Sequence, residues 1–84
     1  MAGGKVRVAI PTKAECERIR PIIRRVFASA GVTGARIETV PFGGLRVHAE
    51  MSGETVVKVT DALFAQGVVI VTLRPGEWRF AIRK

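Results

Sequence analysis

The chain has 84 residues, enough for one small domain with a single core and too few for a second domain or a deep active-site cleft. Hydrophobic residues make up 48% of it, a proportion that excludes a disordered polar tail. Fourteen lysines and arginines stand against seven acidic residues, and the formal charge of +7 favours a polyanionic partner such as nucleic acid or an anionic membrane surface.

Residues 5–84 are expected to form one α+β domain behind a flexible leader of residues 1–4, because MAGG has no side chains with which to dock. The first predicted element is a strand over residues 5–10, in which apolar and other residues alternate with the period of a half-buried strand. Pro11 ends this strand. The side chains expected to face the core are Val6, Val8 and Ile10.

A long amphipathic helix is predicted between Thr12 and Gly31. Thr12 can cap its first turn, while Glu15 reaches back to the Thr12 amide in a capping box. Pro21 lies inside the helix, nearly opposite the apolar stripe, and should bend the helix around the core. The stripe predicted to be buried comprises Cys16, Ile19, Ile22, Ile23, Val26, Phe27 and Ala30.

Cys16 is interpreted as a small buried residue rather than a reactive thiol, because it shares the apolar stripe. As the chain's single cysteine it can form no intramolecular disulfide, which favours a reducing, cytoplasmic setting. The sequence also lacks an apolar run of roughly 18 residues or a basic-then-apolar leader. We therefore expect no membrane association and a cytoplasmic protein.

The segments ARIETV and LRVHAEM are predicted to form a hairpin, in which Thr39 pairs with Leu45 across a loop of residues 40–44. Its inner face is expected to carry Ile37, Thr39, Leu45, Val47, Ala49 and Met51. Its outer face is expected to carry Arg36, Glu38, Arg46, His48 and Glu50. Glu38 then lies opposite Arg46, so this outer row largely neutralises its own charge.

A second amphipathic helix follows over residues 52–67, with a predicted buried arc of Val56, Val59, Thr60, Leu63 and Phe64. The final segment is predicted to be another hairpin. Pro75 and Gly76 fit the centre of a type II turn, which pairs Leu73 with Trp78. This register points Val69, Val71, Leu73, Trp78, Phe80 and Ile82 inward, and Val68, Ile70, Thr72, Arg79, Ala81 and Arg83 outward.

The element order β-α-β-β-α-β-β predicts a two-layer ferredoxin-like sandwich, an antiparallel sheet with two helices on one face and a C-terminal strand added beside the fourth. This order resembles that of the RNA-recognition motif family, in which exposed aromatic residues on the first and third strands stack bases. The corresponding outward positions here are Arg7, Ala9, Arg46 and His48. We therefore expect no base-stacking platform.

Two sets of cations are candidates for phosphate contacts without strong sequence readout. The set expected on the sheet is Lys5, Arg7, Arg79, Arg83 and Lys84. The set expected along the first helix is Lys13, Arg20, Arg24 and Arg25, for which solvated charge is an equally good interpretation. Together they favour a small non-enzymatic module that binds DNA or RNA.

The alternative function is protein assembly or regulation. Val68 and Ile70 are expected outward beside Ala81, as an apolar centre with arginines around it, and this pattern is typical of a protein interface. Two copies packing sheet to sheet would bury it, so we expect a homodimer. The competing interpretation is a central strand that is valine-rich on both faces.

Catalysis ranks third, as a metal-independent ribonuclease centred on His48, the only histidine. The sequence offers no second histidine or tyrosine for the opposite proton transfer. It also lacks the clustered spacing of a zinc or iron site and the strand-to-helix context of a phosphate-cradling glycine loop. We expect no enzyme activity, no cofactor, no metal and no small-molecule substrate.

Overall fold

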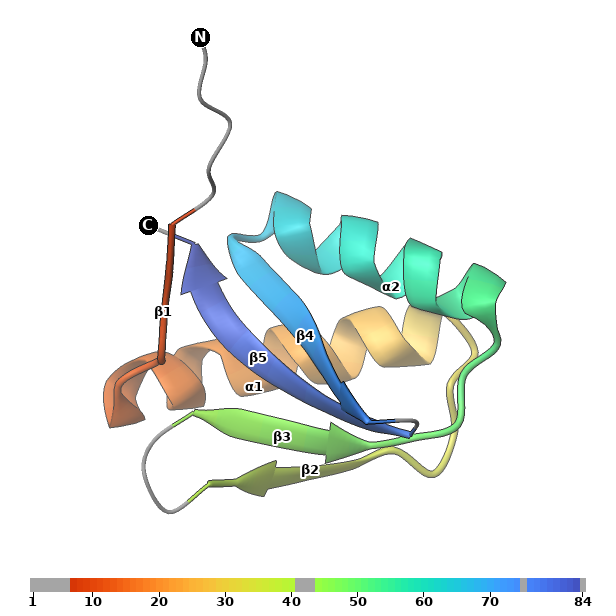
Figure 1. The fold of residues 1–84 in the computed structure, drawn as a ribbon, viewed down its shortest axis with the longest axis horizontal. Helices are drawn as coiled ribbons and strands as arrows, with labels where there is room; N and C mark the ends of the chain where they lie inside the picture. The colour runs from red at the N-terminus through yellow and green to blue at the C-terminus, as the bar shows by residue number, and fades with distance from the viewer. Residues whose placement is uncertain (1–6, 41–43, 75, 84) are drawn as a thin grey trace, which may run out of the picture.

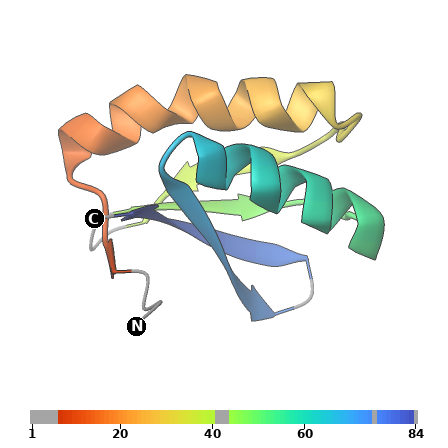
Figure 2. The ribbon, with the colours of Figure 1, turned by 90° about the horizontal axis from the view of Figure 1, so that it is seen from above.

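The computed structural model describes residues 7–40, 44–74 and 76–83, with the backbone alone at residues 72–74. In this part of the chain two helices cover one face of a five-stranded antiparallel sheet (Figures 1 and 2). The predicted α+β fold is confirmed, and it is consistent with a ferredoxin-like sandwich. The predicted leader, and the side chains of Lys5, Val6, Leu73 and Lys84, lie outside the described residues.

Helix α1 spans Lys13–Ser29 and begins with the predicted capping box. The Glu15 amide donates to Thr12 Oγ1 at 3.2 Å, and the Thr12 amide donates to Glu15 Oε1 at 3.0 Å. Pro21 lies within the helix and is exposed, as the sequence predicted for the side away from the core. The fully buried part of the stripe is Cys16, Ile19, Ile23 and Phe27.

Helix α2 spans Gly53–Ala65 and is capped by Ser52, whose hydroxyl accepts from the Thr55 amide at 3.2 Å. Val59 and Leu63 are its buried residues. Phe64 was predicted in the buried arc but is 39% exposed. No helix in the described residues combines the length and apolar character that a membrane span requires.

The strands are β1 (Val8–Ala9), β2 (Arg36–Thr39), β3 (Leu45–His48), β4 (Val68–Arg74) and β5 (Glu77–Arg83). β2 and β3 pair in the predicted register, with Thr39 opposite Leu45. β5 takes the central place in the sheet. One of its edges pairs with β4, and the other pairs first with β3 and then with β1, which lie end to end.

Gly44 makes room for this end-to-end arrangement. Its φ is 90°, in the left-handed region that favours glycine, and a side chain there would meet Ile10 Cγ2 at 3.5 Å and Pro11 Cδ at 3.6 Å. The chain leaving β1 therefore passes closely over the start of β3. Along the described residues β1, β2 and β4 each pair with a single strand, so β4 forms one border of the sheet and β2 and β1 lie at the other.

The predicted faces of β4 are wrong. The turn pairs Arg74 with Glu77 as predicted, and Gly76 has the φ of 80° that a type II turn requires at that position. An irregularity between Thr72 and Arg74 inserts one extra residue in β4, so Thr72 and not Leu73 lies opposite Trp78. One added residue reverses every side chain before it. Val68 is consequently buried at 0% exposure, and Ile70 packs against the core.

The predicted faces of β1 are also reversed. Ala9 lies opposite buried Ile82, so it shares the helix-covered face, whereas Val8 lies opposite Arg83. Val8 is 47% exposed and Ile10 is 65% exposed. The small alanine thus faces the helices in this short strand, where the alternation had placed the two larger residues.

The core lies between the sheet and both helices. Phe27 of α1 contacts Phe80 of β5, with ring centroids 6.2 Å apart. Trp78, Phe80 and Ile82 point inward as predicted. The opposite sheet face, which neither helix covers, is called the open face below.

Candidate nucleic-acid interface

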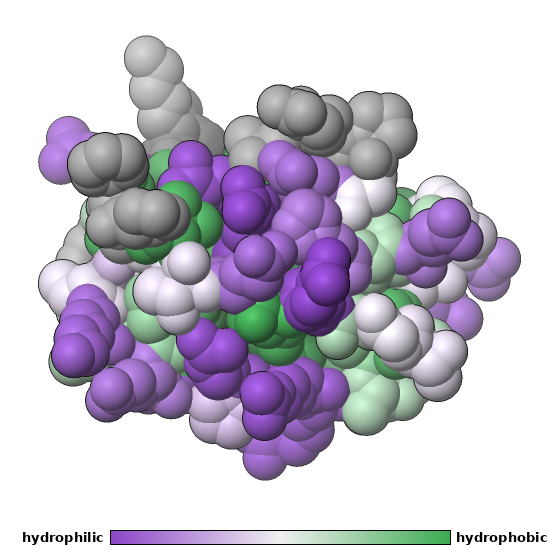
Figure 3. All heavy atoms as spheres, turned by 90° about the horizontal axis from the view of Figure 1, so that it is seen from below, coloured by the Kyte–Doolittle hydropathy of each residue, from purple (hydrophilic) through white to green (hydrophobic). Residues whose placement is uncertain are grey.

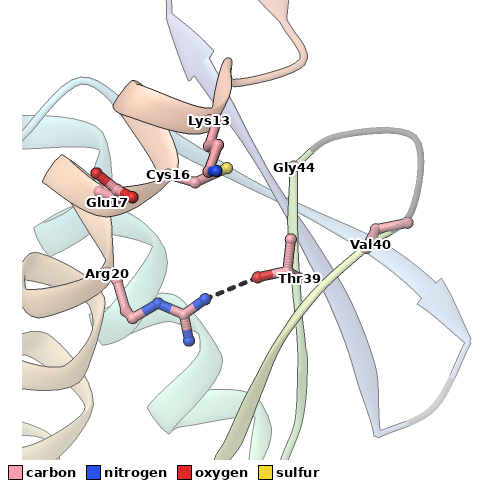
Figure 4. A pocket seen from close by; sticks show the side chains of 7 residues that line it. All are labelled: Lys13, Cys16, Glu17, Arg20, Thr39, Val40 and Gly44. Atoms are coloured by element: carbon pink, nitrogen blue, oxygen red, sulfur yellow. Dashed lines mark hydrogen bonds between the residues drawn. The ribbon is translucent and has the colours of Figure 1, made fainter.

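The side of α1 nearest to β2 carries a stripe of cations. Arg20 and Arg24 follow Lys13 by seven and eleven residues, and both spacings return to the same side of a helix. Arg20 is fixed toward β2, because its Nη2 donates to Thr39 Oγ1 at 2.9 Å (Figure 4). Thr39 lies on the helix-covered face opposite Leu45, as predicted, but it is exposed because β2 is at the border of the sheet.

A pocket of about 460 Å³ separates the start of α1 from the end of β2 (Figure 4). Lys13 and Arg20 give it positive charge, and Glu17 adds one carboxylate. Its lining is completed by Cys16, Thr39, Val40 and Gly44. Cys16 is only 6% exposed, in agreement with the packing role predicted for it.

Arg24 extends the stripe along β2, where it lines a second depression with Ala35 and Ile37. Arg25 belongs elsewhere: it lies in the groove between the helices, beside Lys58 and Ala62 of α2. The predicted helix set is therefore divided by the fold. Arg20 and Arg24 face the β2 border, and Arg25 faces α2.

The open face continues the positive charge across β2, β3 and β5. Glu38 and Arg46 are opposite each other, as predicted, with Oε2 and Nη2 3.8 Å apart. The other Glu38 oxygen lies 2.6 Å from His48 Nε2. A single carboxylate thus contacts two basic side chains, which confirms part of the predicted neutralisation.

Arg46 has a second cross-strand neighbour that the sequence did not reveal. Arg79 of β5 lies directly opposite it, and like charges in that relation are unfavourable. The Nε of Arg46 is also buried and has no hydrogen-bond partner among the described residues. Arg79 forms no ion pair with another described residue. The two arginines are therefore direct cross-strand neighbours on β3 and β5, and Glu38 contacts only Arg46.

The helix stripe and the open-face arginines form one surface that wraps around the β2 border. Seen from the β2 side of the sheet, strongly hydrophilic side chains crowd the middle of this surface, with hydrophobic areas between them (Figure 3). We call it the cationic band, defined as Lys13, Arg20, Arg24, Arg36, Arg46 and Arg79. Four of its members, Lys13, Arg20, Arg24 and Arg79, were predicted, and they are joined by Arg36 of β2 and Arg46 of β3, which had been assigned to a neutralised row.

The remaining predicted cations do not join the band. The Arg83 guanidinium lies 4.5 Å from the centroid of the Phe64 ring, near the end of α2. Arg7 is exposed just before β1. Lys5 and Lys84 lie outside the described residues.

The three residues predicted as a protein interface are separated by the reversal of β4. Val68 lies in the core and Ile70 packs against it, so their outward placement is corrected. Ala81 remains on the open face, opposite Val69.

His48 contacts Glu38 and also lines a shallow depression with Thr33 and Glu50. Within the described residues no group of three or more His, Cys, Asp or Glu side chains could hold a metal ion.

Comparisons of the chain with protein-family models, with curated proteins and with solved structures gave no match.

Proposed function

We propose that this protein is a small, non-enzymatic nucleic-acid-binding module that contacts the phosphate backbone through the cationic band. The observation that carries the proposal is the Arg46–Arg79 pair, two like charges on neighbouring strands with one buried, unpartnered Nε. A phosphate between the two guanidinium groups would supply the missing negative charge and accept their hydrogen bonds.

The shape of the band supports backbone contact rather than base reading. Its cations lie on both sides of the β2 border, where an elongated polyanion could run past helix and sheet together. Trp78 and Phe80 are buried in the core, so neither aromatic ring can stack on a base from the open face. Binding is therefore expected to depend on charge and salt more than on sequence.

Replacing Arg79 with glutamine tests this proposal, and Arg25→Gln is its matched control. Each variant removes one positive charge, but Arg25 lies in the groove between the helices. We expect Arg79→Gln to weaken binding to mixed-sequence DNA and RNA several-fold. The slope of log K against log salt should fall by the amount that about one phosphate contact contributes. Fluorescence anisotropy titrations measure both quantities. Equal losses in the two variants would show that net charge alone acts.

The alternative function, protein assembly through the open face, keeps only Ala81 of its three predicted residues. Val8 and Val71 are exposed there instead. Val71 of β4 is joined by exposed Val57 and Phe64 of α2.

A further inference from the structure

We infer that two copies of this chain associate through their β4 strands, which pair antiparallel and join the two sheets into one. The interface lies at the border of the sheet opposite β2 (Figure 1), and it approaches the cationic band only where Val71 of β4 pairs with Arg79 of β5. The inference is independent of nucleic-acid binding.

The first five residues of β4 lack the features that normally protect an edge strand, and its irregularity and its one charge, Arg74, come at its end. Natural edges are short, or carry charges and prolines that discourage pairing with another chain. β2 follows this rule, with four residues that include Arg36 and Glu38. β4 has seven residues, and its segment VVIVTL contains neither a charge nor a proline. Its irregularity falls after Thr72 and leaves the preceding stretch free to pair.

The hydrogen bonds between β4 and β5 show which backbone amide and carbonyl groups of β4 are left to pair with another strand. The Arg83 amide donates to the Gly67 carbonyl at 2.9 Å, so Gly67 belongs to a hydrogen-bonded pair with β5. In an antiparallel ladder such pairs alternate. The amide and carbonyl groups of Val68 and Ile70 consequently point away from β5, toward the free border, where a further strand would satisfy them.

Exposed apolar side chains flank this border. Val71 is 43% exposed on the open face of β4, and Val57 and Phe64 of α2 are 60% and 39% exposed. Val57 and Phe64 are seven residues apart, on a side of α2 that faces neither the core, where Leu63 lies, nor α1. Figure 2 shows α2 over the β4 side of the sheet and α1 over the β2 side.

The charge distribution selects a second copy as the occupant. Two chains of formal charge +7 repel each other wherever their cations meet. At the β4 border the segment 68–73 is uncharged, and α2 carries Glu54 and Asp61 against Lys58. The arginines of β5 lie one strand away: Arg79 is opposite Val71, and the guanidinium of Arg83 lies on the Phe64 ring. On this side of the molecule, two copies related by a two-fold axis would therefore repel each other less than at the cationic band.

The register of the proposed β4–β4 pairing follows from which β4 residues point their amide and carbonyl groups toward the free border. With Ile70 on the two-fold axis, Ile70 faces its own copy as a hydrogen-bonded pair, and Val69 faces Val71 of the partner copy on the open face. The axis is perpendicular to the sheet, so both α2 helices lie on the same side. Val57 and Phe64 of one copy then approach those of the other.

Solution mass is the first test, with Val71→Lys as the disrupting variant and Val8→Lys as its matched control. Both replace a half-exposed valine of the open face, but Val8 lies on β1. We expect a dimer by light scattering for the parent and for Val8→Lys, and at least a tenfold weaker dimer for Val71→Lys. A monomeric parent at the highest soluble concentration, or equal behaviour of the two variants, overturns the inference.

Disulfide trapping tests the register. Mixed Val69→Cys and Val71→Cys subunits should crosslink efficiently on oxidation, because facing residues in a non-hydrogen-bonded pair are about 4.5 Å apart at Cα, within disulfide range. Each variant alone should crosslink much less, and buried Cys16 serves as the background thiol. A dimer that persists without this mixed crosslink uses another surface, and that result also overturns the inference.

Discussion

At the scale of single residues, Arg79 carries most of the functional argument because its position is unfavourable for folding. It lies directly opposite Arg46, and the carboxylate of Glu38 contacts Arg46 and His48. A protein that needed only a stable sheet could place a neutral residue there. Under the proposed function, an arginine is retained here because a bound polyanion would offset the repulsion.

The same relation predicts a gain in stability from Arg79→Gln. Relief of a facing like-charge pair should raise the free energy of unfolding by about 0.2–1 kcal/mol at low salt. The gain should shrink at high salt, since salt screens exposed charges. Urea unfolding at two salt concentrations measures it, with Arg25→Gln as the variant expected to change little. A loss of stability in Arg79→Gln would mean that the two arginines do not repel.

His48 gives a second prediction at this scale. Its Nε2 is 2.6 Å from Glu38, and we expect the contact to hold the side chain in the sheet rather than to serve proton transfer. The parent protein should leave a labelled RNA intact over hours, and His48→Ala should do the same. Cleavage by the parent that disappears in His48→Ala would establish the ribonuclease hypothesis instead.

At the scale of elements, the sequence predicted what depends on local patterns. The capping box of Thr12 and Glu15, the buried stripe of α1 and the β2–β3 register all follow from short-range spacing, and all are confirmed. The faces of β4 could not be predicted in the same way. VVIVTL is almost uniformly apolar, so its alternation carries no information, and the extra residue before Arg74 leaves no sequence signal.

A matched pair of truncations tests the observed faces of β4. Val68 is fully buried, so Val68→Ala should lower the free energy of unfolding by about 1–3 kcal/mol through lost burial and a small cavity. Val71→Ala, at 43% exposure, should cost clearly less. Chemical denaturation of both variants decides the point. The reverse order would favour the register predicted from the turn alone.

At the scale of the whole molecule, the two borders of the sheet differ in chemistry. β2 is surrounded by the cationic band, and β4 by apolar side chains and an unprotected backbone edge. The sequence could not show this difference, because Arg46 and Arg79 come together only when β3 pairs with β5. A dimer through β4 would join two bands in one enlarged molecule, with Arg79 of each copy one strand away from the junction.

Titration of the parent protein against mixed-sequence DNA and RNA over a range of salt tests nucleic-acid binding most directly. Six cations in the band set an upper limit of about 5 on the slope of log K against log salt for duplex DNA, at about 0.9 per phosphate. We predict clear binding at low salt that falls steeply, with little preference for sequence. Absence of binding to either polymer at low salt would contradict the proposed function.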